Sequence, residues 1–210
     1  KRSIAVICES NEGYRNLINE YNLSPNRLFI SKLYSPLIDE RFIHKEGINN
    51  NLKEKEIYLI YPSAFWPHKN HIFLIFALAL VIKKIPEMRL KFTGFKNEQS
   101  KYIYDKAIEL NVEKNIDFLD FQSTDSLANL LQNSFALVYP SFLWPSNIPP
   151  LEGLSNNCPV FVGDCNQSRD FLGDSVFYFD YQNPQSLANL IISLHEKGRS
   201  EIDLKKSKKF

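Results

Sequence analysis

The sequence predicts an α/β fold in which a parallel sheet of about six strands is covered by helices on both faces. From residue 57 onward, short apolar runs alternate with helix-like segments, which is the pattern of repeated βαβ units. The apolar runs are nearly continuous, as expected of strands that are buried on both faces of a sheet. Right-handed crossovers between such strands produce a doubly wound sheet.

The elements after residue 56 follow in regular order. Strands are predicted over 57–61, 89–93, 116–119, 135–139, 159–162 and 175–179. Helices are predicted over roughly 70–85, 98–111, 124–132, 150–157, 167–172 and 184–197. Thr124 is predicted to be an N-cap, and Pro184 stands at the first position of its helix. The strand order 3-2-1-4-5-6, with these strands numbered along the chain, makes the first and fourth strands neighbours at the switch point.

The rest of the chain divides into a small N-terminal unit, a linker and a tail. Residues 1–34 are predicted to form a separate βαβ unit, with strands over 4–8 and 27–31 and a helix over 12–21. A polar linker is predicted over 35–56, and the main domain over 57–197. A frayed tail is predicted over 198–210. Two strands and one helix cannot bury both faces of a sheet, so we expect the small unit to be poorly anchored unless it docks on another surface.

Composition excludes several classes of protein. The formal net charge of +1 gives no basic field for a nucleic-acid partner. The three cysteines have no metal-site spacing, which favours reduced thiols and a cytoplasmic location. No apolar run reaches the ~18 residues of a membrane span. The sequence also lacks the glycine patterns of dinucleotide and P-loop sites and the G-x-S-x-G elbow of hydrolases.

The unusual residues of the chain gather in the loops that follow the predicted strands. These loops, rich in proline, aromatic and polar residues, are 62–71, 93–96, 120–123, 140–150 and 163–166. The loops that precede the strands, such as 86–88 and 112–115, are ordinary. All loops after parallel strands leave from one edge of the sheet, where ligands of open α/β sheets bind. The sequence therefore predicts a binding site at this edge.

Two charged residues near helix starts are candidates for that site. Lys69 precedes a helix that is predicted to begin near Asn70, and a cation is mildly unfavourable there unless an anion such as a diphosphate lies between it and the helix amides. The other interpretation of Lys69 is a solvated lysine. Glu152 is predicted in the first turn of a helix opened by Pro149 and Pro150. It either complements the helix dipole or accepts hydrogen bonds from a ribose diol.

Other conspicuous residues have both structural and functional interpretations. His68 and His71 are as consistent with capping or packing as with catalysis. Trp66 and Trp144 are predicted to anchor their loops by packing, and either ring is also suited to stacking on a base. Arg169 is interpreted as a helix-surface residue.

Three stretches, in this order along the chain, carry a resemblance to a known family. YPSAFWPHKNH at 61–71, MRLKFTG at 88–94 and the stretch from PSFLWPSNIPPLEG to SLANLI at 140–191 resemble retaining nucleotide-sugar glycosyltransferases of the GT-B fold, group 1 and family 4-like. The resemblance implies that Lys69 binds the donor phosphate and that Glu152 binds the donor ribose. It implies that the backbone at Asn147, Ile148 and Leu151 approaches the phosphates. Further donor contacts are expected at Ser63, His68, Gly94, Phe121, Gln122 and Trp144.

The resemblance also carries expectations about the whole protein. Residues 57–197 look like the Rossmann-like donor-binding half of such an enzyme, and residues 1–34 look like the last βαβ of its acceptor-side domain. The implied donor is a UDP-, GDP- or ADP-sugar, transferred by a hexosyl- or mannosyltransferase-like reaction without a metal. The implied acceptor is a sugar or glycolipid of polysaccharide or glycoconjugate biosynthesis, bound by the missing domain, which would also make any peripheral membrane contact. We read the chain as a fragment that is inactive alone.

The chain departs from the family pattern at two single positions and in one turn. Many members have an arginine where Ser63 stands and a glutamate where Trp144 stands, and Pro145-Ser146-Asn147 replaces a glycine-rich turn. His68 and Arg169 are candidates to replace the missing arginine. A subgroup with W-P-H-K-N-H and N-I-P-P-L-E looks similar to this chain. The departures also leave open a non-catalytic nucleotide-binding module with a regulatory or assembly role. A receiver-type signalling domain is a weaker alternative, because Ser63-Ala64-Phe65 is not an acidic cluster.

Overall fold

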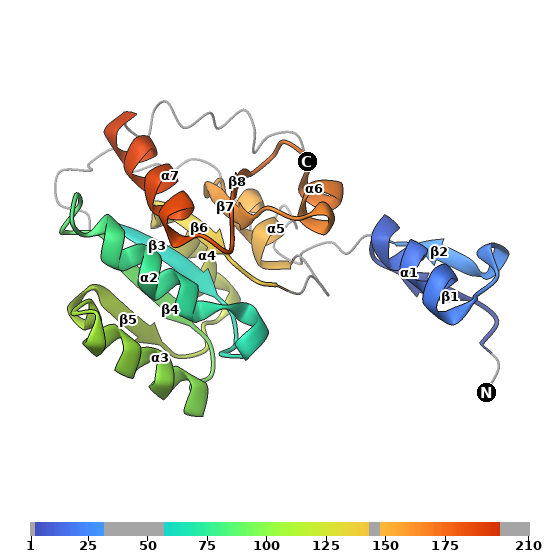
Figure 1. The fold of residues 1–210 in the computed structure, drawn as a ribbon, viewed down its shortest axis with the longest axis horizontal. Coiled ribbons are helices and arrows are strands. Elements are labelled where there is room, and N and C mark those ends of the chain that lie inside the picture. Colours follow the sequence, from blue (N-terminus) through green and yellow to red (C-terminus); the bar gives the residue numbers. More distant parts are fainter. Residues whose placement is uncertain (1–2, 32–56, 143–147, 198–210) are drawn as a thin grey trace.

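The structure is a computed structural model that describes residues 3–31, 57–142 and 148–197 (Figure 1). The predicted linker at 35–56 and the predicted tail at 198–210 lie outside the described residues, as do Trp144 and Asn147. The described part contains a six-stranded sheet flanked by helices and a separate two-stranded unit. The predicted α/β class is confirmed.

The main sheet is parallel throughout and has the predicted strand order. Its strands are β3 (Tyr58–Pro62), β4 (Arg89–Thr93), β5 (Ile116–Leu119), β6 (Ala136–Tyr139), β7 (Val160–Gly163) and β8 (Phe177–Phe179). They lie in the order β5-β4-β3-β6-β7-β8, which is the order 3-2-1-4-5-6 along this sheet. Leu59 of β3 pairs with Ala136 of β6, so the loops after these two strands leave the sheet side by side.

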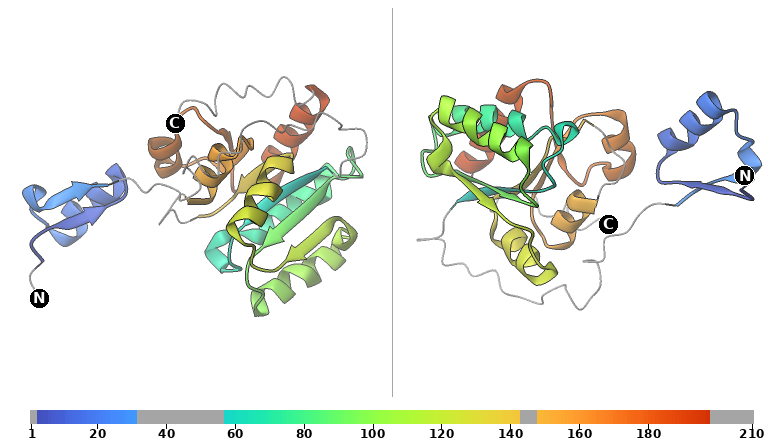
Figure 2. Two further views of the ribbon diagram at one scale, coloured as in Figure 1. Left: turned by 180° about the vertical axis from the view of Figure 1, so that it is seen from behind. Right: turned by 90° about the horizontal axis from the view of Figure 1, so that it is seen from below.

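Helices cover both faces of the sheet. They are α2 (His71–Val81), α3 (Glu98–Glu109), α4 (Thr124–Asn133), α5 (Ile148–Ser155), α6 (Asn166–Leu172) and α7 (Pro184–Lys197). Figure 2 shows α2, α3 and α7 on one face, with α4 and α5 on the other. Helix α2 is apolar nearly all round because it is packed between the sheet and α7. None of the helices in the described ranges is long and apolar enough to cross a membrane.

One predicted N-cap and one predicted helix start are wrong, although α4 begins at Thr124 as predicted. Ser123, not Thr124, is the N-cap of α4, and its hydroxyl accepts a hydrogen bond from the Ser126 amide. Helix α5 begins at Ile148 rather than Pro150, because proline is tolerated throughout the first turn. Glu152 is therefore the fifth residue of α5 and lies beyond the first turn. Its interpretation as a first-turn carboxylate that complements the helix dipole is wrong.

The small unit has the predicted βαβ arrangement. It consists of β1 (Val6–Cys8), α1 (Asn11–Tyr21), a short 3-10 turn and β2 (Leu28–Ile30), with β1 and β2 parallel. Its contacts with the main domain involve α6. The Asp170 carboxylate accepts hydrogen bonds from the backbone amide and the Nδ2 of Asn11, at 3.2 and 2.7 Å. The Gln167 side chain donates to the Glu12 carboxylate at 2.7 Å.

Candidate functional site

The loop between β3 and α2 has a fixed path. Pro67 opens a 3-10 turn over Pro67–Lys69, and Asn70 then takes a left-handed conformation with φ of 56° before α2 begins. Phe65 anchors the loop in the core and is fully buried, with its ring stacked on His71 at 4.6 Å. Trp66 is 56% exposed, so the prediction that Trp66 anchors the loop is wrong. Of the two adjacent aromatic residues, the second faces solvent.

Lys69 is held at both ends by tyrosines. The Tyr61 hydroxyl donates a hydrogen bond to the Lys69 carbonyl oxygen at 2.8 Å. The Lys69 ammonium donates to the Tyr139 hydroxyl at 3.3 Å and lies 5.5 Å from the centre of that ring. Burial lowers the pKa of Lys69. No carboxylate in the described ranges pairs with this ammonium, so its one hydrogen-bond partner there is a neutral phenol.

The loops that follow β3 and β6 are joined to each other. The Asn70 side chain donates to the Pro140 carbonyl oxygen at 3.2 Å. The His68 carbonyl oxygen accepts hydrogen bonds from the Phe142 amide at 3.0 Å and the Ser141 hydroxyl at 3.3 Å. These bonds fix the backbone on either side of Lys69 to the loop that follows β6 and precedes α5.

His71 is a packing residue, which is one of its two predicted interpretations. It is 2% exposed and lies among the rings of Tyr61, Phe65 and Phe92. Neither ring nitrogen makes a hydrogen bond within the described residues. Burial lowers the pKa of His71 to about 3, and the positive charge of Lys69 acts in the same direction. The imidazole is therefore neutral at pH 7.

Glu152 lies on α5, at a point where the helix approaches the sheet closely. A Cβ on the neighbouring Gly153 would lie 2.7 Å from Val160 of β7, so only glycine allows this approach. Burial raises the pKa of Glu152. In the part of the chain that the structure describes, the Glu152 carboxylate has no hydrogen-bond or ion-pair partner. Its cost of burial is therefore not offset by a partner among these residues.

The start of α5 offers few backbone donors. The first four residues of a helix have N–H groups without partners inside the helix. Pro149 and Pro150 carry no N–H, so the first turn has only the amides of Ile148 and Leu151. These are two of the three residues whose backbone was expected to approach the phosphates. The Leu151 side chain itself is buried in the core.

Ser63 and Gly94, both expected donor contacts, lie against each other. The Ser63 amide donates to the Thr93 carbonyl oxygen at 3.0 Å. Gly94 has a φ of 145°, and a Cβ there would lie 2.8 Å from the Ser63 carbonyl oxygen. Glycine is therefore required where the loops after β3 and β4 meet.

The loops after β4 and β5 are joined by an exposed aromatic pair. Phe121 is 67% exposed, and its ring stacks on Phe95 at 5.3 Å. The Gln122 amide group is used within its own loop, donating to the Asp120 carbonyl oxygen and accepting from the Ser126 hydroxyl. Phe121 thus presents a free ring face at the loop edge of the sheet, whereas the side chain of Gln122 has local partners.

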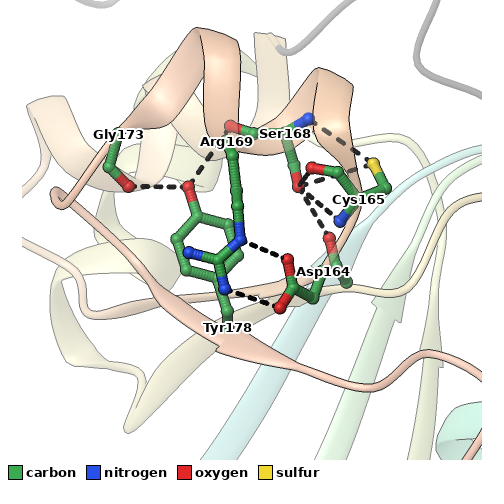
Figure 3. Close-up of polar contacts among 7 residues, drawn as sticks. Asp164, Cys165, Ser168, Arg169, Gly173 and Tyr178 are labelled. Atoms are coloured by element: carbon green, nitrogen blue, oxygen red, sulfur yellow. Dashed lines mark hydrogen bonds and ion pairs between the residues drawn. The ribbon is translucent and has the colours of Figure 1, made fainter.

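The two candidates for the missing arginine do not supply a free cation. The Arg169 guanidinium forms two hydrogen bonds of 2.6 Å with the Asp164 carboxylate and lies over the Tyr178 ring, 4.4 Å from its centre (Figure 3). Burial and the charge of Lys69 lower the pKa of His68, so this imidazole is neutral at pH 7. Lys69 is the cation that the β3–α2 loop contributes. Within the described residues, no three His, Cys, Asp or Glu side chains gather closely enough to hold a metal.

Sequence reasoning missed the two tyrosines that hold Lys69. Tyr61 and Tyr139 are both fully buried, at or near the ends of neighbouring strands. The signal in the sequence was a tyrosine at the end of each of two apolar runs, since a buried tyrosine usually needs a partner for its hydroxyl.

Comparison with known proteins identifies relatives and folds. The chain is 27% identical over 199 residues to the O-antigen chain mannosyltransferase RfbU of Salmonella typhimurium, covering 93% of this chain and 52% of RfbU. It superimposes with a TM-score of 0.78 on a glycosyltransferase from Rickettsia africae, at 15% identity over 97% of this chain and 55% of that one. The TM-score is 0.75 with Anabaena HepE in complex with UDP and glucose, at 18% identity over 98% of this chain and 55% of HepE.

These matches confirm the predicted Rossmann-like fold of a GT-B C-terminal domain. The chain spans about half the length of RfbU and of the Rickettsia africae protein. Residues 43–209 match the family described as glycosyl transferases group 1. The protein therefore belongs to the group 1 glycosyltransferase family.

Proposed function

We propose that this chain binds the nucleotide-sugar donor of a retaining glycosyltransferase, with Lys69 at the diphosphate and Glu152 at the ribose. One observation carries the proposal. Lys69, which follows β3, has a partly buried ammonium without a carboxylate partner among the described residues. Glu152, which follows the neighbouring strand β6, has a partly buried carboxylate without any partner among them. Both lie on the edge of the sheet where ligands of this fold bind.

A nucleoside diphosphate supplies what both groups lack. Its phosphate oxygens accept charge-assisted hydrogen bonds from the Lys69 ammonium. Its ribose diol donates two hydrogen bonds to the Glu152 carboxylate, which accepts only. Pairing on binding offsets the cost of holding two charges away from water. The exposed face of Phe121 and the Ser63–Gly94 contact complete the donor site on this edge.

The chemistry needs stabilisation of a leaving diphosphate. The bond that breaks joins the anomeric carbon of the sugar to a phosphate oxygen, and negative charge grows on that oxygen. The acceptor hydroxyl oxygen forms the new bond to the anomeric carbon, and its proton passes to the leaving diphosphate. Lys69 and the amides of Ile148 and Leu151 are fixed donors for this charge, which is the arrangement that favours the transition state. We propose that no metal is needed, because Lys69 supplies positive charge directly. Transfer proceeds with retention at the anomeric carbon.

The relatives suggest the class of donor and product. RfbU is named a mannosyltransferase of an O-antigen chain, and HepE holds UDP and glucose. We therefore propose a hexose donor on UDP, GDP or ADP and a product in polysaccharide or glycoconjugate biosynthesis, made in the cytoplasm. The acceptor, a sugar or glycolipid, binds to the half of the protein that this chain lacks, so the chain alone does not transfer sugar. Because RfbU is named a mannosyltransferase and the Rickettsia africae protein a glycosyltransferase, a non-catalytic binding module is not favoured.

A ligand panel tests the proposal. A ligand that binds only the folded state raises the unfolding temperature in proportion to the logarithm of its concentration. UDP-, GDP- and ADP-sugars are added separately to the 210-residue chain, and one of the three is expected to raise this temperature. The Lys69→Ala variant should lose most of that shift. No shift with any of the three would contradict the proposed function.

A further inference from the structure

Two buried tyrosines stand behind Lys69, on neighbouring strands. Tyr61 belongs to β3 and Tyr139 is the last residue of β6, and both side chains are 0% exposed. Their rings meet edge to face, with centres 5.8 Å apart and planes at 85°. Fully buried phenol groups are costly unless each hydroxyl finds a partner.

The two hydroxyls contact different parts of the same residue. Tyr61 donates to the backbone carbonyl of Lys69 at 2.8 Å, which fixes where the loop places this residue. Tyr139 accepts from the side-chain ammonium at 3.3 Å, which fixes where the charge lies. A free lysine side chain has about 2 kcal/mol of rotamer entropy. A lysine side chain that is already ordered therefore loses less conformational entropy when the ligand binds.

We propose that Tyr61 and Tyr139 are positioning residues that hold the backbone and the ammonium of Lys69 ready for a diphosphate group. The inference rests on the proposed function and adds to it two residues that do not touch the donor. It also explains why phenols stand at these positions. A carboxylate would form an ion pair with Lys69 and compete with the phosphate, whereas a phenylalanine would leave the ammonium unheld.

The phenols stay neutral, as this role requires. Burial raises the pKa of Tyr139 to about 12, against the opposing effect of its hydrogen bond with the Ser141 side chain. Burial also raises the pKa of Tyr61 well above its usual value. The full positive charge of Lys69 is therefore left for the ligand.

Simple packing is the alternative role, since Tyr61 also contacts His71 and Phe92. Replacement by phenylalanine separates the two roles, because it keeps the ring and removes only the hydroxyl. Tyr58 provides a matched control on the same strand. Its hydroxyl donates to the Leu130 carbonyl oxygen at 2.7 Å, on the side of helix α4 and not at Lys69.

The test measures binding of UDP, GDP and ADP, and of the matching nucleosides, by calorimetry on the 210-residue chain. Tyr139→Phe and Tyr61→Phe are each expected to lower the affinity for whichever nucleoside diphosphate binds the parent by about 3- to 10-fold, which corresponds to one hydrogen bond. Neither variant should change the affinity for the matching nucleoside, and the control Tyr58→Phe should change neither affinity. When Lys69→Ala is already present, Tyr139→Phe should have no further effect, since its action passes through the ammonium.

A spectroscopic measurement does not depend on the folding of a variant. In protein labelled with ¹⁵N-lysine, the ammonium protons of Lys69, identified by their loss in Lys69→Ala, should exchange with water more slowly than those of exposed lysines. Exchange as fast as that of exposed lysines would overturn the inference. The inference would also be overturned if Tyr139→Phe lowered the diphosphate affinity equally in the parent and in the Lys69→Ala variant.

The outcomes separate this inference from the proposed function. Should Lys69→Ala weaken diphosphate binding while Tyr139→Phe and Tyr61→Phe do not, the inference fails and the proposed function stands. Should the parent bind none of UDP, GDP and ADP, both fail.

Discussion

Asn70 donates a hydrogen bond of 3.2 Å to the carbonyl oxygen of Pro140, in the loop that follows the neighbouring strand. Asn70 does so from a left-handed backbone conformation, with φ of 56° and an exposed fraction of only 6%. Asn70 thus turns the chain into α2 and also joins the β3–α2 loop, which carries Lys69, to the loop that follows β6 and precedes α5.

Replacement of Asn70 separates the turn from the hydrogen bond. Asn70→Ala should lower the free energy of unfolding by about 2–3 kcal/mol, from the left-handed backbone and the lost bond together. Asn70→Gly keeps the turn and should cost about 1 kcal/mol. Asn111→Ala is the control, because Asn111 has the same φ of 56° at an exposed position. Urea unfolding measures the free energy of unfolding of all three variants. A loss in Asn70→Ala no larger than that in Asn111→Ala would show that the hydrogen bond from Asn70 to Pro140 does not stabilise the fold.

His71 should make stability depend on pH. Its folded pKa of about 3 lies below the ordinary value of 6.5, so the unfolded chain binds a proton that the folded chain does not. Stability is then fully present above pH 6.5 and falls as pH drops toward the folded pKa. Between pH 7 and pH 5 this one group should lower the free energy of unfolding by about 2 kcal/mol.

The His71→Phe variant keeps an aromatic ring among Tyr61, Phe65 and Phe92 and removes the proton site. Urea unfolding at pH 7 and at pH 5 should show a smaller loss in this variant than in the parent, by about 2 kcal/mol. An identical loss in both proteins would mean that His71 is solvated or partnered in solution.

Donor binding should not require a metal. Lys69 supplies the positive charge at the diphosphate in our account, so EDTA is expected to leave the affinity for UDP, GDP or ADP unchanged within about 2-fold. Calorimetry before and after dialysis against EDTA measures this. Loss of binding with EDTA and its recovery with manganese would contradict the proposed mechanism.

The small βαβ unit should open easily. Ile7 and Phe29 are 68% and 55% exposed, so the two-stranded sheet has little buried surface to protect it. Amides of β1 and β2 should exchange hydrogen faster than those of β3 and β6. Asp170→Ala should speed exchange at the start of α1, where Asp170 contacts Asn11, and the neighbouring Asp174→Ala should not. Slow exchange across β1 and β2 in dilute protein would show that the unit is anchored.

The sheet could be predicted from the sequence because its signals are local. Apolar runs gave five of the strands of the main sheet within about one residue and β8 within two, and their order is that of the doubly wound fold which the alternating pattern predicts. Helix starts were less certain. Ser123 and Thr124 are both good N-caps, and the choice depends on which backbone is extended.

The details of the site depend on contacts between distant residues. Loops have no periodicity, so nothing in the sequence says that Phe65 faces the core and Trp66 the solvent. The hydrogen bonds of Tyr61 and Tyr139 to Lys69 exist only once β3 and β6 pair and their loops meet. Lys69 was found by sequence reasoning because a cation beside a helix start is unusual, and Glu152 was found through the resemblance to the family. Their roles stay predictions.

The central claim is that Lys69 and Glu152 hold opposite ends of one nucleotide. The most direct measurement is calorimetry with whichever of UDP, GDP and ADP binds the parent, and with the matching nucleoside. Lys69→Ala should weaken the diphosphate about 10- to 100-fold and spare the nucleoside, whereas Glu152→Gln should weaken both by about that factor. Lys84→Ala, an exposed lysine beyond the far end of α2, should change neither. If Lys69→Ala and Glu152→Gln both bind like the parent, the donor site lies elsewhere and the account is wrong.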